Sequence, residues 1–171
     1  MGRTGSMFAF QQYDVKPDIL TTAKALGNGV PVGAFCVTDK VAEASLVPGD
    51  HGTTYGGNPL CTAAVTQVFN MFEDYKLLDH VNEISKYLEE ILDRFVAKYD
   101  FVTERRGMGL MQGLVLTVPV KDVVFKALTE QNLVVLSAGK DVLRLLPPLV
   151  ITEQDVDEFK EKLEKVFDSF L

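Results

Sequence analysis

The spacing of hydrophobic positions changes along the chain, and each spacing indicates a different element. Short apolar runs at residues 19–23 and 32–38 predict two strands, the second of them buried, because β-branched and aromatic residues in short runs are typical of buried strands. Asp39 is a suitable N-cap for a brief helix over residues 40–46, which a Pro-Gly pair ends. The first part of the chain is therefore expected to contain strands and a short helix.

Helical spacing begins at Asn58, which is expected to cap a helix with Pro59 at its first position. A second, longer amphipathic helix is expected after a polar break at residues 73–76. Helices of this length are suited to link two domains. The apolar positions that carry the two patterns are Leu60, Ala64, Val65, Val68, Phe69 and Phe72, then Leu77, Leu78, Val81, Ile84, Leu88, Ile91, Leu92 and Phe95.

After residue 100 strand and helix signals alternate, which favours an α/β fold. We therefore predict three parts: residues 1–70, a linking helix at 71–96, and a small domain at 97–171. Within the last part the expected strands are 101–103, 110–118, 133–136 and 142–145, and the expected helices are 121–131 and 152–170.

Composition and charge limit the partners and the cellular location that can be expected for this protein. The chain has 171 residues and a formal net charge of −7, and this acidic balance argues against nucleic acid as a partner. No apolar run is long enough for a membrane span and no signal pattern opens the chain, so a cytoplasmic location is expected. Cys36 and Cys61 lie far apart in apolar surroundings and are predicted to be reduced, buried thiols rather than a disulfide or metal ligands.

Lys24 is the first candidate for chemistry. It follows an apolar strand and precedes the Gly-rich stretch 27–29, so its amine can project into a cleft at the end of the strand. Partial burial would favour the neutral amine, which can attack an aldehyde to form a Schiff base. Taken alone, Lys24 is better explained as a lysine with its head in solvent.

The segment HGTTYGGNP, residues 51–59, is the second candidate. Its hydroxyls at Thr53 and Thr54, its glycines and the helix that follows could bind a phosphate. The alternative is a capped turn without a ligand. His51 has no identifiable partner for a role as general base.

Arg144 is the third candidate, because an arginine among apolar residues needs an anion. A substrate carboxylate would meet that need, and so would an internal salt bridge. The segment GMGLMQG at 107–113 lacks the spacing of a dinucleotide-binding fingerprint, and a tight turn entering a strand is the better interpretation.

Taken together and in this order, these motifs resemble the class III (ornithine-type) aminotransferases, which depend on pyridoxal 5'-phosphate and have fold type I. The resemblance spans the whole chain and rests on GRTGSMFAFQQYDVKPDILTTAKALGNGVPVGAF, HGTTYGGNPLCTAA, RGMGLMQGL and VLRLLPPLVIT. It implies the end of the large α/β domain at residues 1–70, then the linking helix, then the small C-terminal domain.

The resemblance also implies residue roles. Lys24 would form the Schiff base with pyridoxal phosphate and carry a proton between the substrate α-carbon and the cofactor's C4′ atom. Thr54, with Thr53 beside it, would contact the cofactor phosphate across the interface of a homodimer. Arg144 would bind the substrate α-carboxylate.

Within the family, LSAGKDVLRLLPPLVIT is most similar to the members that take N-acetylornithine as amino donor and 2-oxoglutarate as acceptor, in arginine biosynthesis. Ornithine, succinylornithine, 4-aminobutyrate and aminomutase chemistry are alternatives, and so is a non-catalytic dimerisation fragment. The family's aspartate that pairs with the pyridine nitrogen has no counterpart ahead of Lys24. We therefore expect a truncated portion that is inactive alone, with apolar edges bare near residues 19–23 and 32–37 and with residues 97–171 better formed.

Overall fold

The computed structural model describes all 171 residues and divides into two compact units. The first unit comprises Met1 and Phe8–Leu77, and the second comprises Gly2–Met7 and Leu78–Leu171. The loop of residues 2–7 thus belongs to the second unit, although it precedes the first unit along the chain. The division into 1–70, 71–96 and 97–171 remains a prediction.

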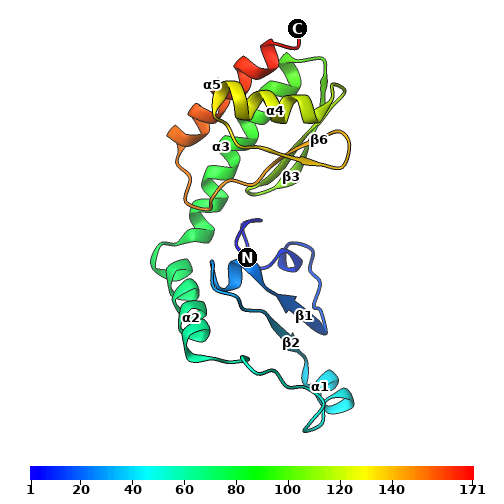
Figure 1. Ribbon diagram of the computed structural model, residues 1–171, viewed down its shortest axis with the longest axis vertical. Coiled ribbons are helices and arrows are strands. Elements are labelled where there is room, and N and C mark those ends of the chain that lie inside the picture. The colour runs from blue at the N-terminus through cyan, green and yellow to red at the C-terminus, as the bar shows by residue number, and fades with distance from the viewer. The chain divides into compact units, whose positions relative to one another are not determined.

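The first unit contains a two-stranded antiparallel sheet and helices (Figure 1). The register of the sheet runs from Ile19 opposite Val37 to Thr22 opposite Ala34. Thr38 is the N-cap of the first α-helix, and Asp39, the expected cap, lies in its first turn. The elements are a 3-10 helix at Ala9–Gln12, β1 (Ile19–Thr22), a 3-10 helix at Lys24–Leu26, β2 (Ala34–Val37), α1 (Asp39–Ser45) and α2 (Pro59–Asp74).

The prediction that the second strand is buried is wrong. Ala34, Phe35 and Cys36 of β2 are all exposed, and Ile19 of β1 is 57% exposed. The two strands pair only with each other, so both outer edges of the sheet are free. Cys36 is therefore an accessible thiol, whereas Cys61 is buried as predicted, with its Sγ 3.6 Å from the carbonyl oxygen of Pro31.

The second unit is built on a four-stranded antiparallel sheet in the order β3-β4-β6-β5. At its centre Gly113 of one strand lies opposite Arg144 of the next, and Arg144 lies opposite Leu136. The elements are α3 (Leu77–Lys98), β3 (Val102–Met108), β4 (Met111–Leu116), α4 (Val120–Gln131), β5 (Leu136–Ala138), β6 (Val142–Leu145) and α5 (Glu153–Asp168) (Figure 1).

Strand β3 extends five residues beyond the strand expected at 101–103, because its charged side chains find partners. Arg105 Nε donates to Asp93 Oδ1 at 2.6 Å, and Arg106 Nη2 donates to Glu104 Oε2 at 2.7 Å. On an edge strand with one accessible face, such residues are compatible with pairing, although they hide the apolar alternation. Residues 107–113 accordingly form the end of β3, a tight turn and the start of β4.

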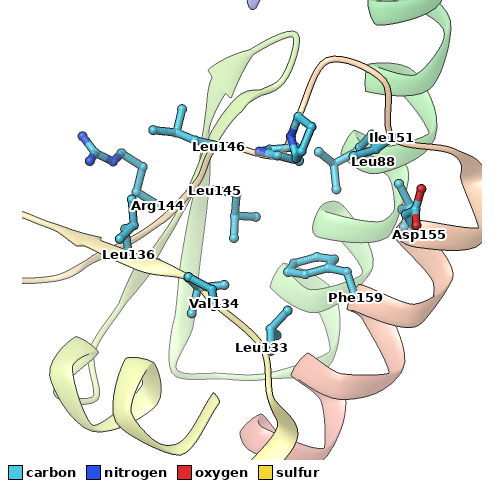
Figure 2. A pocket seen from close by; sticks show the side chains of 14 residues that line it. Leu88, Leu133, Val134, Leu136, Arg144, Leu145, Leu146, Ile151, Asp155 and Phe159 are labelled. Atoms are coloured by element: carbon cyan, nitrogen blue, oxygen red, sulfur yellow. The ribbon is translucent and has the colours of Figure 1, made fainter. Parts of the chain in front are cut away.

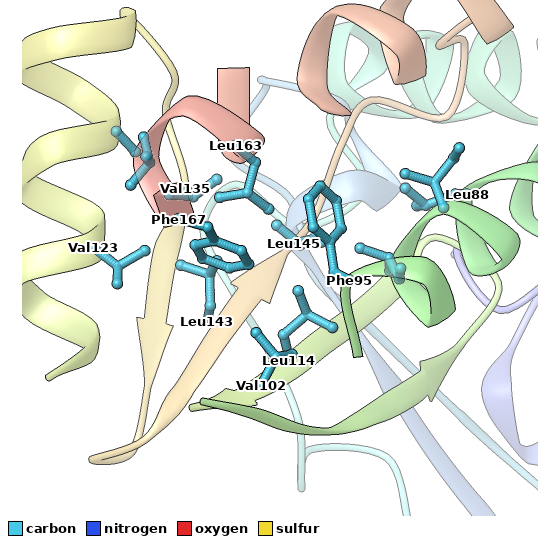
Figure 3. Close-up of a cluster of buried hydrophobic side chains, with 14 of the residues drawn as sticks. Leu88, Phe95, Val102, Leu114, Val123, Val135, Leu143, Leu145, Leu163 and Phe167 are labelled. Carbon is cyan, nitrogen blue, oxygen red and sulfur yellow. The ribbon is translucent and has the colours of Figure 1, made fainter. Parts of the chain in front are cut away.

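One face of the sheet packs against the three helices and forms the main core (Figure 3). Leu114, Leu143 and Leu145 face this core from the two central strands, and each is at most 5% exposed. The helices bring their apolar stripes to the same layer, as their spacing predicts. The core also contains an aromatic cluster, in which Phe95, Tyr99, Phe101 and Phe167 contact one another.

Helix α5 begins with a capping box. The Thr152 hydroxyl accepts from the backbone N–H of Asp155 at 3.3 Å, and the Asp155 carboxylate accepts from the backbone N–H of Thr152 at 2.8 Å. These hydrogen bonds, the backbone one first, lower the pKa of Asp155 below its ordinary value. The final helix thus starts at the residue predicted from the sequence.

Candidate functional site

Lys24 lies just after β1 and has a left-handed backbone, with φ of 53°. A non-glycine residue in this region costs roughly 1–3 kcal/mol, and such strain is concentrated at functional sites. The turn that follows is tight: a Cβ on Gly27 would lie 2.5 Å from Val32 Cγ1 and 2.7 Å from the carbonyl oxygen of Val30. The local sequence thus forces Lys24 out of the strand direction and into a fixed turn.

The amine of Lys24 makes no hydrogen bond and no ion pair, and its side chain is exposed. The partial burial expected at this position is absent within the first unit, because the end of the two-stranded sheet is open. What the structure provides is an unpaired primary amine on a strained backbone. Such an amine is available to condense with an aldehyde.

The loop at residues 51–58 precedes helix α2. Asn58 is its N-cap, with Oδ1 accepting from the backbone N–H of Cys61 at 3.0 Å, as predicted. Thr53 and Thr54 are exposed, and their hydroxyls have no hydrogen-bond partner. A Cβ on Gly56 would overlap the Thr53 methyl group, so a larger residue there would require the Thr53 side chain to move. Free hydroxyls beside a helix N-terminus are suited to an anionic group.

His51 packs its ring edge-on against Phe35, with 5.2 Å between the ring centroids. No polar side chain contacts its nitrogens, so nothing positions it as a general base. Lys24, Thr53 and Thr54 belong to one unit, but no hydrogen bond joins the lysine to either threonine. No three His, Cys, Asp or Glu side chains gather closely enough to hold a metal ion, and no helix has the length and apolar composition to cross a membrane.

Arg144 lies on β6 in the second unit, where side chains alternate between two faces. Leu143 and Leu145 point into the core, and Arg144 points to the opposite, accessible face, with Gly113 opposite it on β4. Its guanidinium makes no ion pair or hydrogen bond, so the alternative of an internal salt bridge is not realised. An unpaired, exposed guanidinium is open to a carboxylate.

An apolar pocket of about 310 Å³ lies in the same unit, between the strands and helices α3 and α5 (Figure 2). Leu145, Leu133 and Phe159 line it together with Arg144, whose guanidinium points away from these side chains in Figure 2. The other side chains are mostly apolar, so the interior of the pocket is poorly suited to an anion.

Sequence reasoning missed two features of the second unit. Gln112 is 2% exposed and donates to Glu89 Oε1 at 2.9 Å and to the carbonyl oxygen of Gly109 at 2.8 Å. The sequence did contain an indication of this, because a glutamine within an apolar strand needs buried hydrogen-bond partners. Arg3 contacts residues more than 100 positions away, and no local pattern marks it.

Comparison with known proteins gives the family. The model of the aminotransferase class-III family matches residues 1–167. The acetylornithine aminotransferase of Methanocaldococcus jannaschii is 46% identical over 98% of this chain, which spans 42% of that relative. The chain thus covers about two fifths of the length of the relatives it matches.

Solved structures agree with the fold. The Plasmodium falciparum ornithine delta-aminotransferase matches 99% of this chain with a TM-score of 0.89 and 34% identity, and 44% of that protein is covered. The acetylornithine aminotransferase of Elizabethkingia anophelis matches 98% with a TM-score of 0.87 and 29% identity, and 43% of it is covered. The α/β fold is that of the corresponding portion of these fold-type I enzymes, and the chain belongs to the class-III aminotransferase family.

Proposed function

We propose that this chain is part of an aminotransferase that moves an amino group from N-acetylornithine to 2-oxoglutarate. Class-III aminotransferases depend on pyridoxal 5'-phosphate. The observation that carries the proposal is the unpaired amine of Lys24 on its left-handed turn, in a chain that matches the family over 167 residues. The similarity to relatives named acetylornithine aminotransferase supports the donor.

The residues present fit the cofactor. Lys24 offers a free amine for its aldehyde, and Thr54 and Thr53 offer free hydroxyls for its phosphate. When bound, pyridoxal phosphate supplies an electron sink for the bonds at the substrate α-carbon. Lys24 would hold it covalently and, once displaced by the incoming amine, its Nζ would take the proton from the α-carbon, because it is already in place.

Arg144 would orient the substrate by its α-carboxylate. A guanidinium can bind both carboxylate oxygens at once, and Arg144 is exposed and unpaired. We extend the proposal to a cytoplasmic homodimer in which Thr54 contacts the phosphate bound by the partner subunit.

The test is covalent trapping. Purified chain is mixed with less than one equivalent of pyridoxal phosphate, reduced with borohydride, digested and analysed by mass spectrometry. We expect the adduct predominantly on Lys24 and not on Lys40, which is exposed on ordinary backbone, or on Lys76, which is exposed and also left-handed with φ of 47°. Lys24→Ala should remove the signal, and Lys40→Ala and Lys76→Ala should retain it. An adduct shared evenly among the three lysines would refute the proposal.

A second candidate donor is ornithine, because a solved ornithine aminotransferase superimposes closely on the chain. The two donors are separated by assaying the whole aminotransferase that contains this chain with 2-oxoglutarate as acceptor. A higher kcat/KM with N-acetylornithine than with ornithine supports the proposed donor, and the reverse order replaces it.

A further inference from the structure

Arg3 binds the loop of residues 2–7 to two other segments of the second unit. The Nη1 group of Arg3 donates to the carbonyl oxygen of Pro147 at 2.6 Å and to that of Leu110 at 3.2 Å. The backbone N–H of Leu110 donates in return to the carbonyl oxygen of Arg3 at 2.8 Å. One residue thus makes three hydrogen bonds to two separate segments of the second unit.

The surface under the loop is shaped to receive it. Gly109 has φ of 59°, and a Cβ there would overlap the Arg3 carbonyl oxygen and lie 2.9 Å from Thr4 Cα. Asn82 of α3 donates from Nδ2 to the carbonyl oxygen of Gly5 at 3.0 Å. Only glycine at position 109 lets the backbone of the loop approach this closely.

The guanidinium of Arg3 is partly buried and has no carboxylate partner, and burial lowers the pKa of this group below its ordinary value. Its charge is therefore compensated by backbone carbonyl groups alone. Both hydrogen bonds come from Nη1, whose N–H groups are fixed in the plane of the guanidinium, whereas a lysine ammonium is a compact point charge on a flexible stem. The interaction therefore depends on the geometry of an arginine and not only on its charge.

Both carbonyl groups lie at the ends of the strands that hold Arg144. Leu110 directly precedes β4, whose Gly113 lies opposite Arg144. Pro147 comes two residues after the end of β6. Arg3 therefore joins the entrance of β4 to the exit of β6, at the end of the sheet where these two strands pair around Arg144.

We propose that Arg3 is a positioning residue, which fixes the exit of β6 and thereby the direction in which Arg144 presents its guanidinium. The inference rests on the proposed function only in taking Arg144 as the carboxylate-binding group. Arg3 does not touch the substrate in this scheme. It acts through the backbone at Leu110 and Pro147.

The test compares amide hydrogen exchange by NMR in the full chain and in Arg3→Gln. Losing hydrogen bonds from a charged donor should speed exchange at Leu110, Arg144 and Leu145 by about tenfold to a hundredfold. The amide of Leu116, which donates to Asp141 at 2.8 Å at the far end of β4, should be unchanged. The Nε–Hε signal of Arg144 should shift.

Controls separate positioning from a general loss of stability. Arg94→Gln removes an exposed arginine of α3 and should change none of these amides. Arg3→Lys keeps the charge and should give a smaller change than Arg3→Gln. Methylguanidinium, well below denaturing concentrations, should partly restore protection in Arg3→Ala, because it can occupy the vacated space.

Two results would overturn the inference. Faster exchange confined to Leu110 would mean that Arg3 only anchors its own loop. An equal increase at Leu116 would mean that the whole unit is destabilised. The Lys24 trapping experiment leaves Arg3 unchanged, so its failure would count against the proposed function and leave the exchange result for Arg3 intact.

Discussion

Phe167 is expected to be among the most destabilising positions to truncate. Its side chain is fully buried, and its ring meets those of Phe95, Tyr99 and Phe101 edge-on, with centroids 5.2–5.4 Å apart. These partners come from helix α3 and the segment after it, so the contacts of Phe167 pack α5 against the rest of the core. Phe167→Ala would leave a cavity enclosed by three rings that cannot easily collapse into it.

The magnitude follows from this geometry. Phenylalanine-to-alanine changes in cores cost about 3–5 kcal/mol, and each edge-to-face pair adds about 0.5–1.5 kcal/mol beyond the buried area. We expect Phe167→Ala to lower the free energy of unfolding of the second unit by about 4 kcal/mol. Phe167→Leu keeps most of the volume and should cost about 1.5 kcal/mol. With a urea m-value of about 2 kcal/mol/M, the alanine variant shifts the midpoint by roughly 2 M.

Urea unfolding can be followed by far-ultraviolet circular dichroism and by tyrosine fluorescence, since the chain has no tryptophan. Tyr99 reports directly on the cluster, because its hydroxyl donates to Asp168 at 2.6 Å and its ring contacts Phe167. The matched control is Phe125→Ala on α4, whose side chain is 67% exposed and should change stability by no more than about 0.5 kcal/mol. Equal midpoints for the Phe167 and Phe125 variants would show that the aromatic cluster does not hold this core.

Three further outcomes are expected. Gly109→Ala should lower the urea midpoint more than Gly139→Ala, because both glycines have positive φ but only the first lacks space for a Cβ; equal shifts would contradict the close approach at Gly109. The hydrogen bonds that cap α5 lower the pKa of Asp155, so this carboxylate adds stability above its unfolded pKa of about 3.9, and that stability is lost as pH falls through the lower folded value. Asp155→Asn should therefore flatten the dependence of the urea midpoint on pH below about 4. An unchanged slope would count against this role of Asp155. Cys36 should react with a thiol reagent much faster than Cys61 in the native chain, and equal rates would place both in the same environment.

The helices could be predicted because their apolar residues recur with helical spacing and their caps are local. Asn58 and Thr152 cap their helices through residues three positions away, and both are recognisable in the sequence. Strand β3 was only partly predicted, because Glu104 and Arg106 interrupt its apolar pattern. Both lie on β3, and their ion pair joins side chains two residues apart along this one strand.

The candidate site, like the strands, could be predicted only in part from the sequence. The sequence indicates that Lys24 and Arg144 carry chemistry, but not that Lys24 is strained or that Arg144 lacks an internal partner. The first fact depends on how the turn after β1 closes, and the second depends on which face of the sheet is covered. The role of Arg3 depends on segments that meet only in the folded chain, so no local spacing could have indicated it.

The position of residues 2–7 has a consequence for the order of folding during synthesis. Leu110 and Pro147 follow Arg3 by 107 and 144 residues, so the loop leaves the ribosome long before its acceptors exist. At about 5–20 residues per second, Arg3 waits roughly 7–30 s for Pro147. Binding of this loop is therefore among the last folding steps of the second unit. Until then, the entrance of β4 and the exit of β6 are joined only by the pairing of the two strands.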